Sequence, residues 1–216
     1  MTQIKSISLV VFLIAVLFAL GSVEAAIVYP VDDASVINTE PDTAHPDGNI
    51  LTWTAYMSGG RGRSYIKFQT ASLPPLSLVT AVTLNLYQYD AGGFVPWVSI
   101  CNVSDDSWSQ DTLTWNNMPS AGSTINLKDI GFEHQWVSFD LFSNGEWNYQ
   151  ADLEDGFASF LIKSDESGDE RHNFYSSEEE VVGDFRPYLQ VWYIPEPATI
   201  AMLTLGSIMC IKRREK

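Results

Sequence analysis

The middle of the chain consists of short stretches in which apolar and polar residues alternate. Residues 65–68, 82–87 and 189–193 each follow this pattern, and turns such as Leu73-Pro74-Pro75 separate them. Alternation with a period of two is typical of a half-buried β-strand, because successive side chains point to opposite faces of a sheet. The pattern therefore predicts an all-β fold, most simply a two-sheet β-sandwich of the jelly-roll type. One short helix is expected near residues 142–149.

The first 25 residues have the order of a secretory signal. Lys5 precedes an apolar run from Ile7 to Leu20, and the exit sequence Val23-Glu24-Ala25 follows before Ala26. This order predicts a signal helix that is cleaved after Ala25. An uncleaved anchor is the alternative, and the length of the run disfavours it because a spanning helix needs about 20 apolar residues.

The C-terminal segment 195–216 contains Pro195-Glu196-Pro197, then an apolar run from Ile200 to Ile211, then a basic cluster. This order resembles the PEP-CTERM sorting signal of exopolysaccharide-producing Gram-negative bacteria. The resemblance implies a short hydrophobic helix that holds the chain in the inner membrane until an exosortase-type processing enzyme removes it. An ordinary tail anchor is the alternative. We therefore expect a signal peptide at 1–25, a folded domain at 26–194, and a secreted or cell-surface location.

Charge narrows the range of partners. The chain has 27 acidic and 12 basic residues, and its formal charge is -15. Residues 26–194 hold seven basic against 24 acidic residues, which gives -17 for the expected domain. Nucleic acid is excluded as a partner, because phosphates require a basic face that this balance does not supply. Cys101 is the only cysteine of the domain, so an internal disulfide is excluded as well.

Three blocks of the sequence resemble the DNRLRE domain, which is also classed as carbohydrate-binding module family 96. The blocks are residues 64–87, residues 108–119, and residues 174–178 together with 187–191. The most specific is the middle block, with two tryptophans followed by Asn-Asn-x-Pro. The resemblance implies a secreted, non-catalytic β-sandwich, with alginate-type acidic polysaccharide as the ligand of some members. Gln69 and Ser177 depart from the family pattern, which has Asp and Arg there.

Polysaccharide recognition combines aromatic faces that stack on sugar rings with basic groups that meet carboxylates. Alternation predicts that Tyr65 and Lys67 lie on the exposed side of their strand, with Tyr87 in the same register of the next strand. Lys163 is predicted to join them. The alternative is that Lys67 and Lys163 pair with carboxylates and Tyr65 is an ordinary strand residue.

Further ligand-binding residues are expected at the rim of this cluster. Arg61 and Arg63 lie in a glycine-flanked stretch that predicts a mobile loop, and Trp97 follows a proline in a stretch that predicts an exposed turn. Trp108 and Trp115 are expected to be core or corner residues, because sheets of this size need large apolar side chains where they meet.

Asp32 and Asp33 are predicted to be protein ligands of a structural calcium ion, which favours carboxylate oxygens, although no EF-hand motif is present. Catalysis is not expected, because the histidines lack metal-ligand spacing and no serine or cysteine nucleophile motif occurs. The sequence thus predicts an exported, non-catalytic polysaccharide-binding module. The alternative is a structural protein of the extracellular matrix or cell envelope without specific affinity for a glycan.

Overall fold

The computed structural model describes residues 23–46, 50–55, 59–93, 97–132, 134–164, 169–178 and 184–195. Residues 1–22 of the predicted signal peptide lie outside these residues, whereas Glu24 and Ala25 belong to a described strand. The sorting segment after Pro195 also lies outside them. Among the residues that are described, no helix has the length and apolar character needed to cross a membrane.

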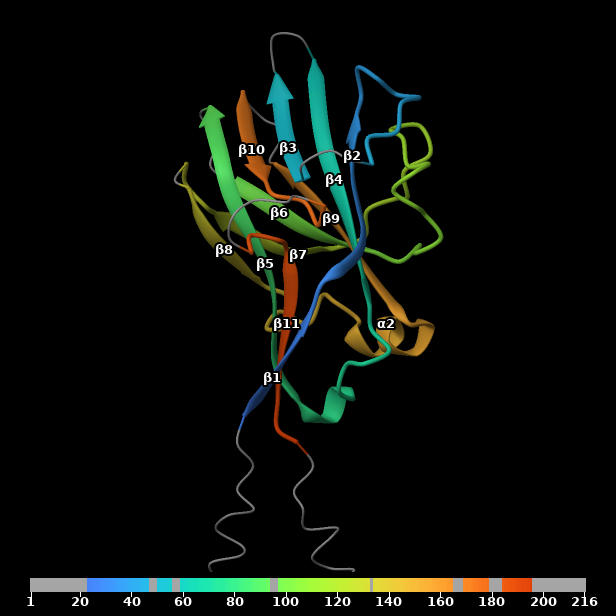
Figure 1. The fold of residues 1–216 in the computed structure, drawn as a ribbon, viewed down its shortest axis with the longest axis vertical. Helices are drawn as coiled ribbons and strands as arrows, with labels where there is room; N and C mark the ends of the chain where they lie inside the picture. Colours follow the sequence, from blue (N-terminus) through green and yellow to red (C-terminus); the bar gives the residue numbers. More distant parts are fainter. Residues whose placement is uncertain are drawn as a thin grey trace, which may run out of the picture.

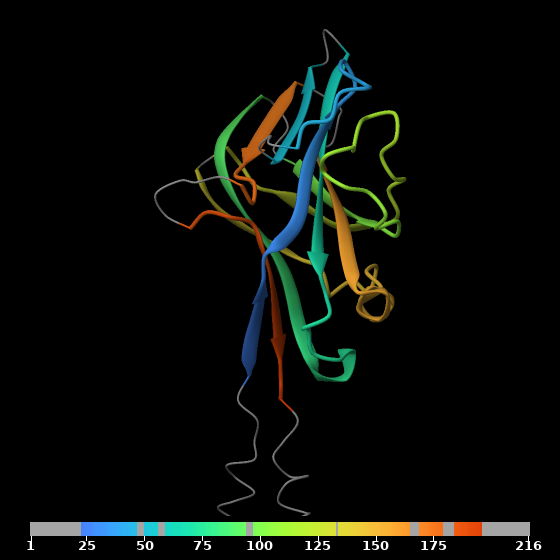
Figure 2. The same cartoon turned by 45° about the vertical axis from the view of Figure 1, so that its right-hand side comes forward.

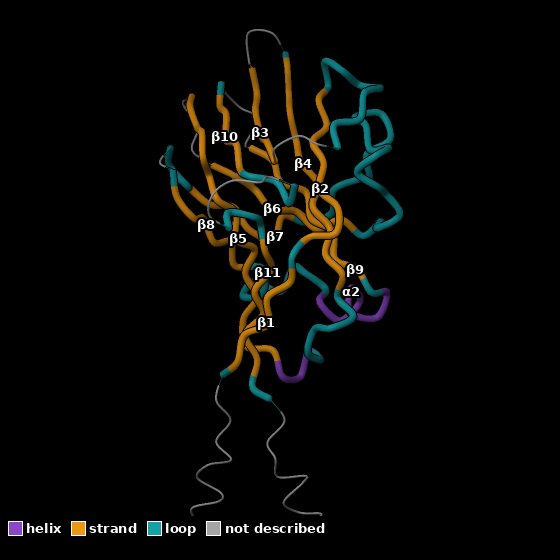
Figure 3. Tube along the Cα trace, viewed as in Figure 1, coloured by secondary structure: helices purple, strands orange, loops and turns teal. Residues whose placement is uncertain are grey.

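Antiparallel strands make up most of the described chain (Figures 1 and 3), which confirms the all-β prediction. The strands are β1 (Glu24–Val28), β2 (Pro30–Ile37), β3 (Ile50–Ala55), β4 (Gly60–Gln69), β5 (Val79–Gly93), β6 (Trp97–Val103), β7 (Thr124–Asp129), β8 (Gln135–Asp140), β9 (Phe157–Ser164), β10 (Glu170–Phe174) and β11 (Tyr188–Tyr193). The helical elements are η1 (Leu76–Leu78) and α2 (Tyr149–Asp155).

The strands form two packed layers. In the first layer, the long strand β5 pairs with β8 along one edge and with β11 and β10 along the other, and β1 extends the layer beyond β11. In the second layer, the order is β2, β4, β9, β6 and β7. Strand β3 pairs with both β10 and β4 and so joins the two layers.

The main core lies between the layers and follows the predicted alternation. Ile66 and Phe68 of β4 are fully buried there, together with Leu84 and Leu86 of β5. Because neighbouring residues of a strand point in opposite directions, the residues between them point away from this core. Each layer therefore has an inward side and an outward side.

A second, smaller core lies on the outward side of the second layer. Residues 104–123, which connect β6 to β7, cover part of that side and bury Trp108 and Leu113 against Tyr65 and Leu161. Figures 1 and 2 show this connection on the opposite side of the molecule from β8. The connection therefore covers some of the outward-facing residues of β4 and β9 and leaves others accessible to solvent.

The helix lies about two turns later than predicted, at residues 149–155 rather than 142–149. The Asp140 carboxylate accepts hydrogen bonds from the backbone N–H groups of Phe142 and Ser143, which fixes a turn there. The helix begins only after Asn148, whose side chain accepts a hydrogen bond from the Ala151 N–H. Gly156, with φ of 94°, ends it.

Candidate functional site

The outward side of β4 carries Arg61, Arg63, Tyr65 and Lys67, because Ile66 and Phe68 face the core. The prediction that the two arginines lie in a loop is wrong. Residues 60–62 pair with β3 and so extend β4 toward its N-terminal end. All four side chains are therefore held on one strand.

Tyr65 is buried, contrary to the predicted exposure, and only 1% of its surface is accessible. Its hydroxyl donates a hydrogen bond to the backbone carbonyl of Pro119, at 2.8 Å, and its ring meets Trp108 edge-on with the centroids 5.9 Å apart. Burial raises the pKa of the Tyr65 hydroxyl to about 12. Alternation places this side chain correctly, but residues 104–123 cover it.

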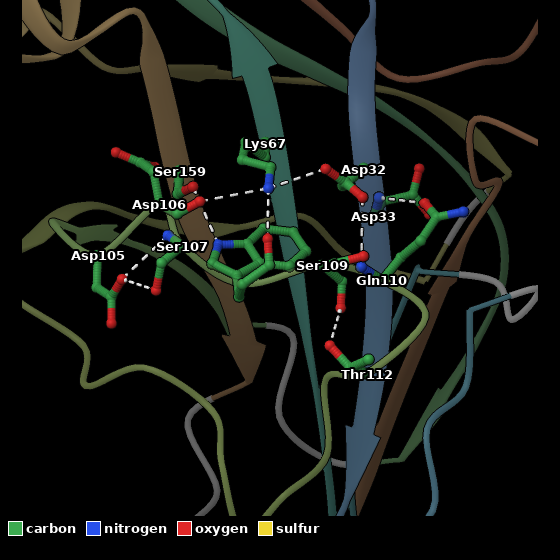
Figure 4. Close-up of polar contacts among 11 residues, drawn as sticks. Asp32, Asp33, Lys67, Asp105, Asp106, Ser107, Ser109, Gln110, Thr112 and Ser159 are labelled. Carbon is green, nitrogen blue, oxygen red and sulfur yellow. Dashed lines mark hydrogen bonds and ion pairs between the residues drawn. The ribbon is translucent and has the colours of Figure 1, made fainter.

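Lys67 lies beneath the same connection and is 6% exposed, so its predicted exposure is also wrong (Figure 4). Its Nζ forms an ion pair with Asp32 Oδ2 at 2.9 Å and donates hydrogen bonds to the backbone carbonyls of Trp108 and Asp106. Nζ also lies 4.5 Å from the centroid of the Trp108 ring. These contacts fit the alternative in which Lys67 pairs with a carboxylate, and they fasten the connection to the sheet.

Asp32 and Asp33 do not share a calcium site, because consecutive residues of β2 point to opposite sides. Asp32 is neutralised by Lys67, whereas Asp33 is buried and its Oδ2 accepts a hydrogen bond from the Ser177 N–H at 2.9 Å. Burial of the Asp33 carboxyl raises its pKa to about 7. Among the described residues, no group of three or more His, Cys, Asp or Glu side chains could hold a metal ion. The two carboxylates therefore do not fit a calcium ion in this arrangement.

Beyond this cover, the outward side of the second layer carries side chains that are only partly buried, Arg63 and Lys163 among them. Lys163 of β9 pairs with Ser99 of β6. On the other side of β9, Ser64 of β4 pairs with Ile162, so the preceding residue Arg63 lies beside Lys163. The Lys163 and Arg63 side chains are therefore neighbours on adjacent strands, and both point outward. Within the part of the chain that the structure describes, the Lys163 amine forms no hydrogen bond or ion pair.

Aromatic side chains flank these two cations. Trp97, the first residue of β6, lies diagonally across from Lys163 and is 42% exposed. It is exposed as expected, although it begins a strand rather than lying in a turn. The half-buried Trp115 ring faces Arg63, whose guanidinium carbon is 4.9 Å from the ring centroid. We name this open surface, which comprises Arg61, Arg63, Lys163, Trp97 and Trp115, the basic face.

Tyr87 does not belong to the basic face, because it points outward from the first layer. It contributes to a cluster of aromatic rings that sequence analysis did not predict, and which we name the aromatic face. The residues of the aromatic face are Tyr87, Tyr89, Trp136, Tyr175, Phe185 and Tyr188. They come from β5, β8, β11 and the connection between β10 and β11, so no single segment reveals them. The outward positions of Tyr87 and Tyr89 in the alternation of β5 are the one local signal.

Comparisons with known proteins bear on what this architecture does. No curated protein matches the chain. The model of carbohydrate-binding module family 96 matches residues 24–193, which include every described strand. Carbohydrate-binding modules are generally non-catalytic and hold a glycan on their surface. The chain belongs to carbohydrate-binding module family 96.

Proposed function

We propose that this protein is an exported, non-catalytic module that holds acidic polysaccharide through the basic face. The observation that carries the proposal is the convergence of Arg61, Arg63 and Lys163 on one open surface, together with the partly exposed Trp97 and Trp115. Tryptophan rings stack on the apolar sides of sugar rings, and basic side chains bind the carboxylates of a uronate.

The charge of the remaining molecule restricts such a ligand to this surface. Four further basic residues of the domain are each bound to a protein oxygen. Lys67 pairs with Asp32, Arg171 with Asp90 and Arg186 with Asp184, while Lys128 donates to the Ser138 carbonyl. An acidic glycan is repelled elsewhere by a domain of net charge -17, whereas a local group of cations attracts it.

Alginate binding tests the proposal. We expect the purified protein to be retarded in native gels that contain alginate, and less so as salt is added, because salt screens contacts between exposed charges. Trp97→Ala and Lys163→Ala are each expected to weaken binding about tenfold, which corresponds to about 1.4 kcal/mol. Trp136→Ala is the matched control, since Trp136 is 41% exposed and lies on the aromatic face. Absence of binding to every acidic glycan would leave the structural matrix role as the better explanation.

We also propose that residues 195–216 sort the protein through an exosortase-type enzyme at the inner membrane. In a Gram-negative host that carries such an enzyme, the wild-type chain is expected to lose its tail, so its mass falls and it leaves the membrane fraction. Replacing Pro195, Glu196 and Pro197 with alanine is expected to leave an intact chain in the membrane fraction. Equal processing of both chains, measured by mass spectrometry, would contradict the sorting role.

A further inference from the structure

We propose that the aromatic face is a second glycan-binding site, specific for an uncharged polysaccharide, so that one molecule joins two different polymers. The inference goes beyond the proposed function because it concerns another face, another class of ligand and another activity, which is cross-linking. Its basis is the ring geometry of the aromatic face, the hydroxyl groups of Tyr87, Tyr175 and Tyr188, and the charge around the face.

The rings of the aromatic face support one another in fixed orientations. The Tyr175 ring is stacked on Tyr89 with centroids 4.5 Å apart and an interplanar angle of 22°. Trp136 is held edge-on by Tyr87 and Tyr188, at centroid distances of 5.5 Å and 5.3 Å. Despite these contacts, Trp136 remains 41% exposed. A rigid, partly exposed indole ring loses little conformational entropy when a sugar ring stacks on it.

The polar atoms of the aromatic face favour a sugar over an apolar partner. Within the described part of the chain, the hydroxyl groups of Tyr87, Tyr175 and Tyr188 have no protein hydrogen-bond partner, nor does the Trp136 indole N–H. The four side chains are half-buried or exposed, so these groups reach solvent. An apolar partner would bury these donors without satisfying them, at a cost in free energy. A polysaccharide supplies both apolar ring faces and hydroxyl groups.

The charge around the aromatic face favours an uncharged ligand. In the described segments that form it, the basic residue is Arg186, and Arg171 lies in the neighbouring β10. Arg171 forms an ion pair with Asp90 at 3.1 Å, and Arg186 forms one with Asp184 at 2.9 Å. No cation of these segments therefore remains to meet the carboxylates of an acidic polymer. The exposed Glu178, which follows Tyr175 in the connection after β10, adds negative charge.

The two faces lie on separate layers of the sandwich. The basic face lies on the outward side of β4, β9 and β6, and the aromatic face lies on the outward side of β5 and β8. Figure 2 shows β4 and β5 running through different parts of the molecule. The main core lies between the two layers. Two polymer chains can therefore bind at once without touching each other.

Hydroxyethylcellulose, an uncharged soluble β-glucan, is the first probe. We expect hydroxyethylcellulose to retard the wild-type protein in native gels. Trp136→Ala should bind this glycan at least tenfold more weakly, whereas Trp136→Phe should keep most of the binding. Trp97→Ala is the matched control and should bind it like the wild type, while its alginate binding falls. The proposal is overturned if uncharged glucans, mannans and galactans all fail to retard the wild type, or if Trp136→Ala binds them unchanged. Far-ultraviolet circular dichroism checks that each variant is folded.

Cross-linking is measured with alginate beads and fluorescein-labelled hydroxyethylcellulose. The wild-type protein is expected to recruit fluorescence to the beads, and neither Trp97→Ala nor Trp136→Ala should do so. Binding of each glycan separately without recruitment would overturn cross-linking by one molecule. Alginate binding without any binding of hydroxyethylcellulose or other uncharged glycans would refute the second site and leave the proposed function intact. Loss of self-association in Trp136→Ala, with no change in glycan binding, would identify a protein interface instead.

Discussion

Lys67→Met is expected to lower the free energy of unfolding by about 3 kcal/mol, because it removes one partner of a largely buried ion pair. Asp32 would keep its charge without Lys67, and the carbonyls of Trp108 and Asp106 would lose a donor. Methionine has nearly the same length and fills most of the same space, so the loss comes mainly from charge and hydrogen bonding. The expected value lies at the lower end of the range for such pairs because the Asp32 side chain is 21% exposed.

Urea unfolding of the wild type, Lys67→Met and Lys163→Met measures this effect. Lys163 is the matched control, because it also points outward from the second layer but has no ion pair among the described residues. We expect Lys163→Met to change the free energy of unfolding by no more than about 0.5 kcal/mol. Limited proteolysis adds a local readout, since residues 104–123 should be cut faster in Lys67→Met. Similar unfolding midpoints for all three proteins would show that Lys67 does not fasten this connection.

The stability of the domain is expected to fall as the pH rises from about 4 to about 7. Burial raises the pKa values of Asp33 and Asp152 from 3.8 to about 7. Between these values the folded protein keeps two protons that the unfolded chain releases. Raising the pH therefore favours unfolding, by at most about 1.4 kcal/mol per pH unit for each group. Below both pKa values, and above pH 7, these two groups add no further pH dependence.

Thermal unfolding between pH 5 and pH 8 tests this expectation. The melting temperature of the wild type should fall over that range, and the double variant Asp33→Asn/Asp152→Asn should show a much flatter profile. Asparagine is the appropriate replacement because it keeps an acceptor for the Ser177 and Trp147 N–H groups, which donate to these carboxylates. A wild-type melting temperature that is constant or rises from pH 5 to pH 7 would show that the two carboxylates are not held in their protonated form.

The alternation of apolar and polar residues predicts the fold closely. It does not predict which outward-pointing side chains of the strands are exposed to solvent. Alternation along β4 correctly separates Ile66 from Tyr65 and Lys67, since this separation depends only on the geometry of a strand. Whether the outward residues meet solvent depends on residues 104–123, which are far away in the sequence and are attached through Lys67 itself. Periodicity carries no information about such a cover.

The alternating pattern also does not predict which strands become neighbours in space. Tyr87 and Lys67 occupy equivalent positions in their alternations but lie on different layers, because β5 pairs with β8, β10 and β11 rather than with β4. Lys163 and Trp97 become neighbours only through the pairing of β9 with β6. Apart from Trp115, for which the sequence predicts a place in the core or at a corner, the basic face thus contains predicted ligand-binding residues in an unpredicted combination. The aromatic face depends almost wholly on strand pairing.

The position of β11 has a mechanical consequence for a protein tethered through the segment that follows it. Strand β11 lies between β1 and β5 and is paired with both along most of its length. A polymer pulling on the outward faces would load the tether along the axis of β11, across backbone hydrogen bonds that run perpendicular to it. These bonds would then break together in shear rather than one after another. While the proposed C-terminal segment is still attached, β11 would therefore pass a pulling force on to its neighbouring strands instead of peeling away from them.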